Sequence, residues 1–205
     1  MPGFRSRRIS RAHELWGSLL VALLLFVILR TFCVQAFRIP SSSMEETLLI
    51  GDFIFISKVD YGARVPGTPW RLPGFRDPRP GDVIVFAYPE AQGEREVDFI
   101  KRCVAVEGDT VELRENRLYV NRRPVEEPFV ALKDSPYPPR SDWGPSVVPP
   151  DHLFMLGDNR NNSQDSRYWG FLEKGRVKGL AMVLYFSWDK DRRLPRLLRF
   201  FRPVS

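Results

Sequence analysis

An uncharged apolar stretch at residues 15–29 constrains the fold of this chain more than any other feature. It consists of Leu-Trp-Gly-Ser-Leu-Leu-Val-Ala-Leu-Leu-Leu-Phe-Val-Ile-Leu, and the apolar character resumes after Arg30 and continues to Phe37. Because an arginine side chain can extend its charge toward the lipid headgroups, the whole stretch exceeds the ~20 residues that a membrane-spanning helix needs. The sequence therefore predicts a transmembrane helix over residues 15–37, preceded by a basic segment at residues 1–14.

A cleaved secretory signal is the alternative, because it also combines a basic start with an apolar core. Its removal requires small residues shortly after that core, whereas residues 32–37 are Phe-Cys-Val-Gln-Ala-Phe. These bulky side chains favour an anchor that is retained.

The net charge of +6 is concentrated at the two ends of the chain. Excess arginine before a membrane span keeps that end in the cytoplasm, so residues 38–205 are expected on the outer face of the cytoplasmic (inner) membrane. The middle of the chain is nearly balanced, which predicts a lipid bilayer and not a nucleic acid as the partner of the charged ends. The terminal arginines are Arg5, Arg7, Arg8 and Arg11, and Arg192, Arg193, Arg196, Arg199 and Arg202.

Residues 38–205 have the pattern of a mainly β domain. Gly-Asp pairs introduce strand-like runs at residues 53–56, 83–86 and 110–113, and Glu115-Asn116-Arg117 is placed like a hairpin turn. The apolar run at 179–186 predicts a strand that is buried on both faces. We therefore expect an antiparallel β-sheet domain behind a single N-terminal transmembrane helix.

Two regions depart from this pattern. Residues 124–150 are rich in proline, which predicts an inserted lobe within the domain. From Leu194 onward, leucines and Phe201 alternate with arginines in the manner of an amphipathic helix. That helix could close the domain or rest on anionic lipid.

The cysteines and histidines are too few for several kinds of site. The chain has two of each, and His152 is the single histidine after residue 38. A zinc site of His and Cys ligands is therefore difficult to assemble, and we expect neither a metal nor an organic cofactor. A histidine base would have to be His152.

Three serines, Ser41 to Ser43, follow Pro40 directly after the predicted anchor. Ser42-x-x-Glu45 and Ser43-x-x-Glu46 both fit the capping-box pattern at the start of a helix. The alternative is a nucleophile at a membrane surface. This stretch alone favours the cap, because short motifs often match by chance.

Lys101 lies in the strand-like run Phe99-Ile100-Lys101-Arg102-Cys103-Val104. On a strand it shares one face with two apolar neighbours, Phe99 and Cys103. Most strand lysines extend to solvent, but burial would lower the pKa of this amine and allow it to act as a general base for a serine. Lys58, at the end of another strand-like run, is the alternative lysine.

A dense polar run at residues 157–170 follows four apolar residues. An exposed turn is its simplest interpretation, and Arg160 occupies a position where a calcium loop needs an oxygen ligand. Alternatively, Asp158, Arg160, Asp165 and Arg167 form a salt-bridged frame that directs the hydroxyl of a serine at a site.

Three motifs occur in one order: Ser43-Met44, the Ile-Lys-Arg strand, and Gly-Asp-Asn-Arg-x-Asn-Ser-x-Asp-Ser-Arg. Together with the anchor they resemble type I signal peptidase, from the anchor to Asp189. The resemblance implies that Ser43 is the nucleophile, Lys101 the general base, and Ser41 a donor to the oxyanion hole beside the Ser43 amide. It also implies that Ser163 orients the lysine amine. The supporting charge network would be Asp158, Arg160, Asp165 and Arg167.

The same resemblance implies shallow pockets for small residues one and three positions before the cut. Their lining would be Phe37, Ile39, Pro40, Met44, Leu48, Val85, Phe99 and Ile100. Ser42 stands where the family commonly has glycine, Glu46 where it has proline, and Asn161 where it has aspartate. None of these departures removes a group that performs the chemistry.

The expected function is that of a serine endopeptidase that removes N-terminal signal peptides from exported preproteins, with a Ser-Lys pair. The resemblance leaves room for association with the export machinery. A self-cleaving Ser-Lys peptidase of the repressor type is the nearest alternative, but the apolar stretch and the lack of a DNA-binding segment before it argue against that. A non-enzymatic module that binds anionic lipid is the other alternative.

Overall fold

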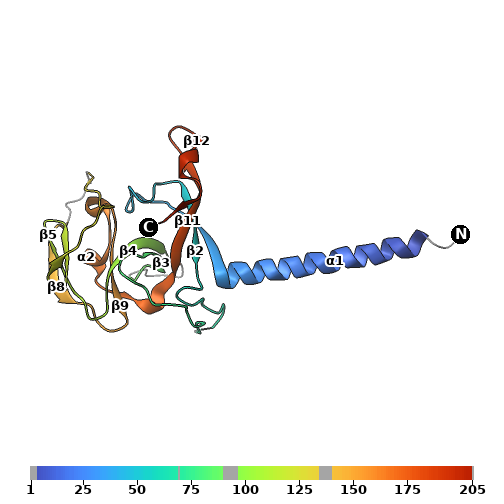
Figure 1. The fold of residues 1–205 in the computed structure, drawn as a ribbon, viewed down its shortest axis with the longest axis horizontal. Helices are drawn as coiled ribbons and strands as arrows, with labels where there is room; N and C mark the ends of the chain where they lie inside the picture. Colours follow the sequence, from blue (N-terminus) through green and yellow to red (C-terminus); the bar gives the residue numbers. More distant parts are fainter. Residues whose placement is uncertain (1–3, 69, 90–96, 134–139, 205) are drawn as a thin grey trace.

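The structure, a computed structural model, describes residues 4–68, 70–89, 97–133 and 140–204, with the backbone alone for residues 4–15. A long helix, α1, extends from one end of a β domain, and the C-terminus lies within that domain (Figure 1). The N-terminal elements are α1 (Phe4–Ile28) and a π-helical turn, η1 (Leu29–Cys33). The strands are β1 (Val34–Arg38), β2 (Asp52–Ser57), β3 (Val83–Ala87), β4 (Asp98–Val106), β5 (Thr110–Arg114), β6 (Arg117–Val120), β7 (Arg123–Pro124), β8 (Trp143–Val147), β9 (His152–Leu156), β10 (Leu172–Glu173), β11 (Val177–Asp189), β12 (Leu194–Pro195) and β13 (Arg202–Pro203). The short helices are η2 (Arg160–Asn162), α2 (Ser166–Trp169), η3 (Lys174–Arg176) and η4 (Leu197–Arg199).

Helix α1 fits the predicted membrane anchor. It contains no proline, so nothing interrupts its backbone hydrogen bonds, and the window Trp16–Cys33 has a mean hydropathy of 2.1 with no residue buried. It is the one helix among the described residues that is long and apolar enough to cross a membrane. The prediction that the span reaches residue 37 is wrong, because residues 34–37 pair with β2 as part of strand β1.

The larger sheet has the strand order β1-β2-β11-β3-β4-β9-β10 in the described part of the chain, with β12 and β13 also paired to β11. Its pairings are antiparallel, which confirms the expected mainly β fold. The sequence predicts that strand β11 is buried on both faces, but only one face is buried. Gly179, Ala181 and Leu184 are buried, whereas Leu180 and Tyr185 are partly exposed, because one face of the strand points to the core and the other is only partly covered. A register shift between Ala181 and Val183 moves the buried positions from odd to even residue numbers.

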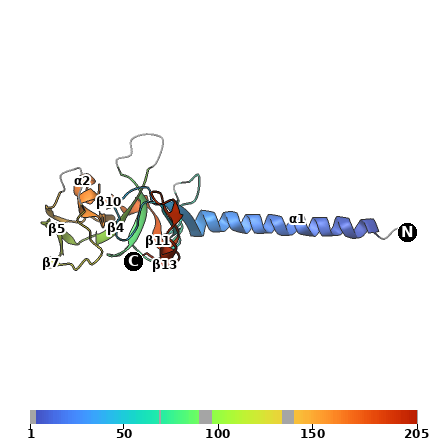
Figure 2. The same cartoon turned by 90° about the horizontal axis from the view of Figure 1, so that it is seen from above.

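A smaller sheet, with the order β7-β6-β5-β8, lies at the end of the domain opposite α1 (Figures 1 and 2). The predicted hairpin is confirmed, since Glu115 and Asn116 connect β5 to β6 with φ angles of 49° and 64°. Two positive φ angles match a turn whose twist suits the right-handed twist of the strands. Residues 143–147 of the proline-rich region form β8 of this sheet, while residues 134–139 lie outside the described residues.

The C-terminal region is not a helix. Residues 194–195 and 202–203 are short strands on β11, and only η4 between them is helical. The reason is that β11 presents free backbone groups, which Arg196 N and Val204 N satisfy by donating to the carbonyls of Ser187 and Met182. Leu198 remains 99% exposed and Phe201 77% exposed.

Candidate active site

The three serines lie in a chain of turns between β1 and β2. Pro40 follows the last residues of β1 and donates no backbone hydrogen bond, so pairing with β2 stops there. Met44 and Leu48 are fully buried and pack with Ile39 in the core, and Leu48 N donates to Met44 O. No α-helix begins within residues 41–50, so the capping interpretation of the serines does not hold. Their turns instead fix Ser43 against the core.

Lys101 of β4 reaches Ser43 from the neighbouring part of the large sheet. Its Nζ donates to Ser43 Oγ at 2.7 Å and to Ile100 O at 3.0 Å, and the residue is only 3% exposed. Desolvation of the ammonium by burial lowers the pKa of Lys101 from 10.5 to about 8, although Asp165 and Asp158 act in the opposite direction. The amine is thus in contact with a hydroxyl and is half deprotonated at about pH 8.

Ser41 lies next to the Ser43 hydroxyl, whereas Ser42 is hydrogen-bonded to the polar run. Ser41 Oγ lies 3.5 Å from Ser43 Oγ and is exposed to the cleft side of the turn. Ser42 Oγ accepts a hydrogen bond from Asn162 Nδ2 at 2.8 Å, and its carbonyl accepts one from Asn159 Nδ2 at 3.2 Å. The residue that departs from the usual glycine is therefore tied to the polar run.

Ser163 is placed beside the serine turn without a hydrogen bond. Its Oγ is buried and has no partner among the described residues, so the expected bond to the Lys101 amine is not present. Gly157 explains the close packing here, because a Cβ atom at this position would overlap Ser163 Oγ and lie 2.6 Å from Ser43 O. The orienting role of Ser163 stays a prediction.

The sequence suggested that the four charged residues of the polar run form one salt-bridged frame. In the structure they do not. Asp165 pairs with Arg167 through 2.8 and 2.9 Å bonds, and both are fully buried. Asp158 instead pairs with Arg102, through 2.9 and 2.7 Å bonds, and Arg160 pairs with Glu127.

Arg102 and Glu127 are the partners that the sequence analysis missed. Arg102 carried a usable signal, because alternation on β4 turns it away from Lys101 and an arginine buried in a strand requires a carboxylate. It is only 2% exposed. Nothing in the sequence singled out Glu127.

A cleft of about 700 Å³ opens over Ser43 and Lys101. Of the predicted pocket residues, Pro40, Phe99 and Ile100 line it, together with Ser41, Ser42, Ser43, Val97, Asp98, Lys101, Asn161, Asn162, Ser163, Gln164 and Tyr168. The other predicted residues are not in that lining: Phe37 is partly exposed beside the core, and Ile39, Met44, Leu48 and Val85 are each at most 2% exposed within it. Ile39, Met44, Leu48 and Val85 therefore offer almost no surface to a ligand in this structure.

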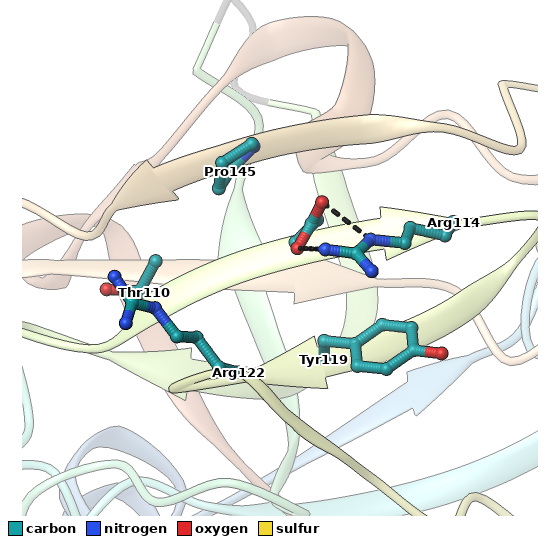
Figure 3. A pocket seen from close by; sticks show the side chains of 6 residues that line it. Thr110, Arg114, Tyr119, Arg122 and Pro145 are labelled. Atoms are coloured by element: carbon teal, nitrogen blue, oxygen red, sulfur yellow. Dashed lines mark hydrogen bonds and ion pairs between the residues drawn. The ribbon is translucent and has the colours of Figure 1, made fainter.

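A second hollow, of about 360 Å³, lies on the smaller sheet (Figure 3). Its lining consists of Thr110, Glu112, Arg114, Tyr119, Arg122 and Pro145, and Glu112 and Arg114 neutralise each other through paired hydrogen bonds. This lining includes no nucleophile next to a base. Within the described ranges, no three His, Cys, Asp or Glu side chains come together in a way that could hold a metal ion.

Comparison with known proteins assigns the family. The model of the family described as "Signal peptidase, peptidase S26" matches residues 12–188. The chain belongs to this signal peptidase family. The match begins within α1 and covers the serine turn, β4 and the polar run, which are the segments that build the cleft.

Two curated signal peptidases illustrate the relationship. A probable signal peptidase I-2 from Synechocystis sp. is 38% identical over 84% of this chain and 72% of its own length. Signal peptidase I from Pseudomonas aeruginosa is 35% identical over 92% of this chain and 77% of its own length. A crystal structure of a signal peptidase I from Enterococcus faecalis aligns with 51% of this chain and 96% of its own chain, at 30% identity and a TM-score of 0.42.

Proposed function

We propose that this protein is a serine endopeptidase that cleaves signal peptides from preproteins after small residues, with Ser43 as nucleophile and Lys101 as general base. The observation that carries the assignment of residues is the 2.7 Å contact between Lys101 Nζ and Ser43 Oγ within a cleft. A serine hydroxyl attacks a carbonyl efficiently only when a neighbouring group accepts its proton. A neutral lysine amine can do so without a histidine.

The reaction follows from this geometry in two halves. The neutral Lys101 amine accepts the Ser43 proton as Oγ attacks the scissile carbonyl, and the resulting ammonium donates that proton to the leaving amine. Water then enters, Lys101 accepts one of its protons, and the resulting hydroxide attacks the acyl carbon. The bond from that carbon to Ser43 Oγ breaks, and the Lys101 ammonium returns the proton to Oγ, which restores the hydroxyl and the neutral amine. In both halves the Ser43 amide and the Ser41 hydroxyl donate to the negative oxygen, which is typically the largest electrostatic contribution.

His152 is poorly placed as an alternative base. It begins β9, whereas Gly157, next to Ser43, follows the other end of that strand. Its Nδ1 is in hydrogen-bond contact with Pro150 O at 2.7 Å. A histidine that acted on Ser43 would need to approach the hydroxyl within hydrogen-bond distance.

The arrangement relative to the membrane completes the proposal. Residues 1–14 would be cytoplasmic, α1 would cross the inner membrane, and residues 38–205 would lie outside as the catalytic domain, with residues 124–150 as a lobe of that domain. The arginine excess before α1 supports this orientation. Contact with the lipid bilayer is supported by the exposed Leu197, Leu198 and Phe201 beside arginines, and association with the export machinery would follow from the substrate.

Cleavage of a preprotein by the purified full-length protein, with sequencing of the new N-terminus, tests this function. Ser43→Ala and Lys101→Met should each reduce kcat by about a thousandfold or more, since each removes a member of the reacting pair. Lys174→Met is a matched control, because Lys174 pairs with Glu107 at the surface and does not line the cleft. Normal processing by Lys101→Met would contradict the mechanism, and a large loss in His152→Ala would assign the base to histidine.

A further inference from the structure

The C-terminal strap, which we define as residues 194–204, lies against the segment that carries the serine turn. Its two short strands pair with β11, and Val204 packs against the core cluster that includes Met44 and Leu48. In Figure 1 the red C-terminal segments run beside β11 and β2, and the chain end returns to the middle of the domain. The strap is therefore part of the support of the site and not a free tail.

Arg199 makes the closest connection between the strap and that segment. Its Nη2 donates to Asp52 Oδ2 at 2.7 Å and to the carbonyl of Thr47 at 2.9 Å. Asp52 is fully buried and also accepts from Leu49 N at 2.8 Å and from Ser187 Oγ at 2.6 Å. One guanidinium thus joins both ends of residues 47–52, the connection between the serine turn and β2.

The contacts continue from Thr47 to the surroundings of the base. Thr47 Oγ1 donates to Asp158 Oδ2 at 2.5 Å, and Asp158 forms the buried pair with Arg102. Asp158 also acts on the Lys101 amine, whose pKa its negative charge raises against the effect of burial. A continuous set of hydrogen bonds therefore runs from Arg199 to the carboxylate that helps to set the charge of Lys101.

We propose that the C-terminal strap positions the catalytic pair, with Arg199 as a positioning residue that acts through Thr47 and Asp158. The inference rests on the function proposed above. Arg199 Nη2 contacts both the Asp52 carboxylate and the Thr47 carbonyl, and Nε adds a longer bond to Asp52 Oδ1 at 3.4 Å. Lysine has one nitrogen in place of this fork, so it cannot contact both carboxylate oxygens in the same planar geometry while it holds the Thr47 carbonyl. A displacement of the serine turn by a fraction of an ångström to one ångström lowers the rate without abolishing substrate binding.

Arg199→Lys in the full-length protein tests the inference, because it keeps the positive charge beside the buried Asp52. We expect kcat for preprotein cleavage to fall by about tenfold or more, with KM within about twofold of wild type. Arg202→Lys is the matched control, since Arg202 lies on the same strap with an exposed side chain and should leave both constants unchanged. Equal kcat values for the two variants would overturn the inference.

Hydrogen exchange provides a readout that does not depend on activity. In Arg199→Lys the amides of Leu48 and Leu49, which donate to Met44 O and to Asp52, should exchange faster, while core amides of β4 keep wild-type rates. A uniform acceleration across the domain would mean that Arg199 only stabilises the fold, and this outcome would also overturn the inference. If the wild type cleaves no preprotein, the proposed function fails, whereas the exchange experiment still decides whether the strap holds residues 47–52.

Discussion

At the scale of single residues, the site depends on the charge state of one amine. The Lys101 amine is enclosed by the Ile100 carbonyl, the Ser43 hydroxyl and the Phe99 ring, whose centroid is 5.1 Å away. These groups solvate an ammonium less well than water does, so burial favours the neutral form. Asp158 and Asp165 limit this effect, and the resulting pKa of about 8 leaves a minority of neutral amine at pH 7.

The pH dependence of cleavage follows from this pKa. Below pH 8 the fraction of neutral Lys101 falls about tenfold per pH unit, so log(kcat/KM) should rise with a slope near one and level off above about pH 8. A pH–rate profile between pH 5 and about 9.5 measures it, after a stability scan has established the range in which the protein stays folded. A profile centred near the ordinary pKa of histidine would contradict the assignment of the base.

Lys101 should also cost stability. In the folded protein its pKa is lowered to about 8, so the unfolded chain binds more protons between about pH 8 and 10.5, and stability rises with pH across that window. Below pH 8 the full penalty is present, about 3 kcal/mol by the conversion of a pKa difference into free energy. Lys101→Met, which keeps most of the volume, should therefore unfold at a higher denaturant concentration than wild type at pH 7.

The comparison of these two proteins above pH 10.5 is the internal control, because the difference should largely disappear there. An equal difference at both pH values would mean that packing, and not the charge of the amine, separates them.

At the scale of elements, the polar run from residue 157 to residue 167 is held by ion pairs to two other parts of the fold and by one ion pair within the run. Asp158 is bound from β4, Arg160 from the loop at Glu127, and Asp165 by Arg167 at the start of α2. All are buried, and removing one partner of a buried pair typically costs about 3–5 kcal/mol. These pairs matter for the site because the run that they hold carries Asn162 and Ser163 into the cleft.

The hydrogen bond from Asn162 to Ser42 should matter for the oxyanion site, because Ser42 lies between the two proposed oxyanion donors. Asn162→Ala should lower kcat by about three- to tenfold through looser positioning of the turn. Ser42→Gly should have a similar effect, since glycine lacks the acceptor and adds backbone freedom.

A double-mutant cycle on preprotein cleavage measures this coupling. Ser42→Gly combined with Asn162→Ala should be little worse than either single change, because both remove the same bond. Fully additive losses would show that the two residues act independently.

Some elements of the fold could be predicted from the sequence, and the contacts between them could not. Strands near Phe53, Val83 and Thr110 and the α1 helix could be predicted, because turn residues and hydropathy are local signals. Lys101 could be placed on a strand, but its contact with Ser43 spans 58 positions and became an expectation only through the family motifs.

The failures have a physical reason. Arg102 and Glu127 could not be identified as partners, because pairing is decided when distant segments pack. For the same reason the sequence does not show that Met44 and Val85, which are predicted to line a pocket, are buried in the core. The C-terminal region has a helical pattern, yet its backbone pairs with β11. Tertiary hydrogen bonding overrode local periodicity there.

At the scale of the whole molecule, the larger sheet lies next to α1 and the smaller sheet lies beyond it. Strands β1, β2 and β11 are next to α1, and the smaller sheet with β5 and β8 is at the far end (Figures 1 and 2). The cleft is built from segments of the large sheet and the polar run, so the smaller sheet adds no side chain to its lining. The smaller sheet instead packs Val111 and Leu113 into a cluster that also contains Val104 and Phe154 of the larger sheet.

Removal of residues 1–33 tests whether the predicted anchor contributes to the cleavage reaction itself or only to cleavage at a membrane. The remaining chain keeps β1 and the Lys101–Ser43 contact, so cleavage of a short soluble peptide should stay within about threefold of the full-length value. Cleavage of a preprotein in vesicles should fall by about a hundredfold or more, because the anchor raises the effective concentration of enzyme at the membrane. Equal losses on both substrates would show that α1 supports the fold of the site itself.

The junction between α1 and the sheet contains no flexible linker. The turn η1 continues directly into β1, and Lys58 Nζ donates to the carbonyls of Arg30 and Thr31. The 18-residue span is about 27 Å long, close to the hydrocarbon thickness of a thin bilayer. Helices adjust to bilayer thickness by tilting. Because α1 is joined to the edge strand β1 without a linker, a change in its tilt also turns the sheet. We therefore expect lipid composition to change the tilt of the cleft relative to the bilayer plane, and with it the scissile bonds that Ser43 reaches.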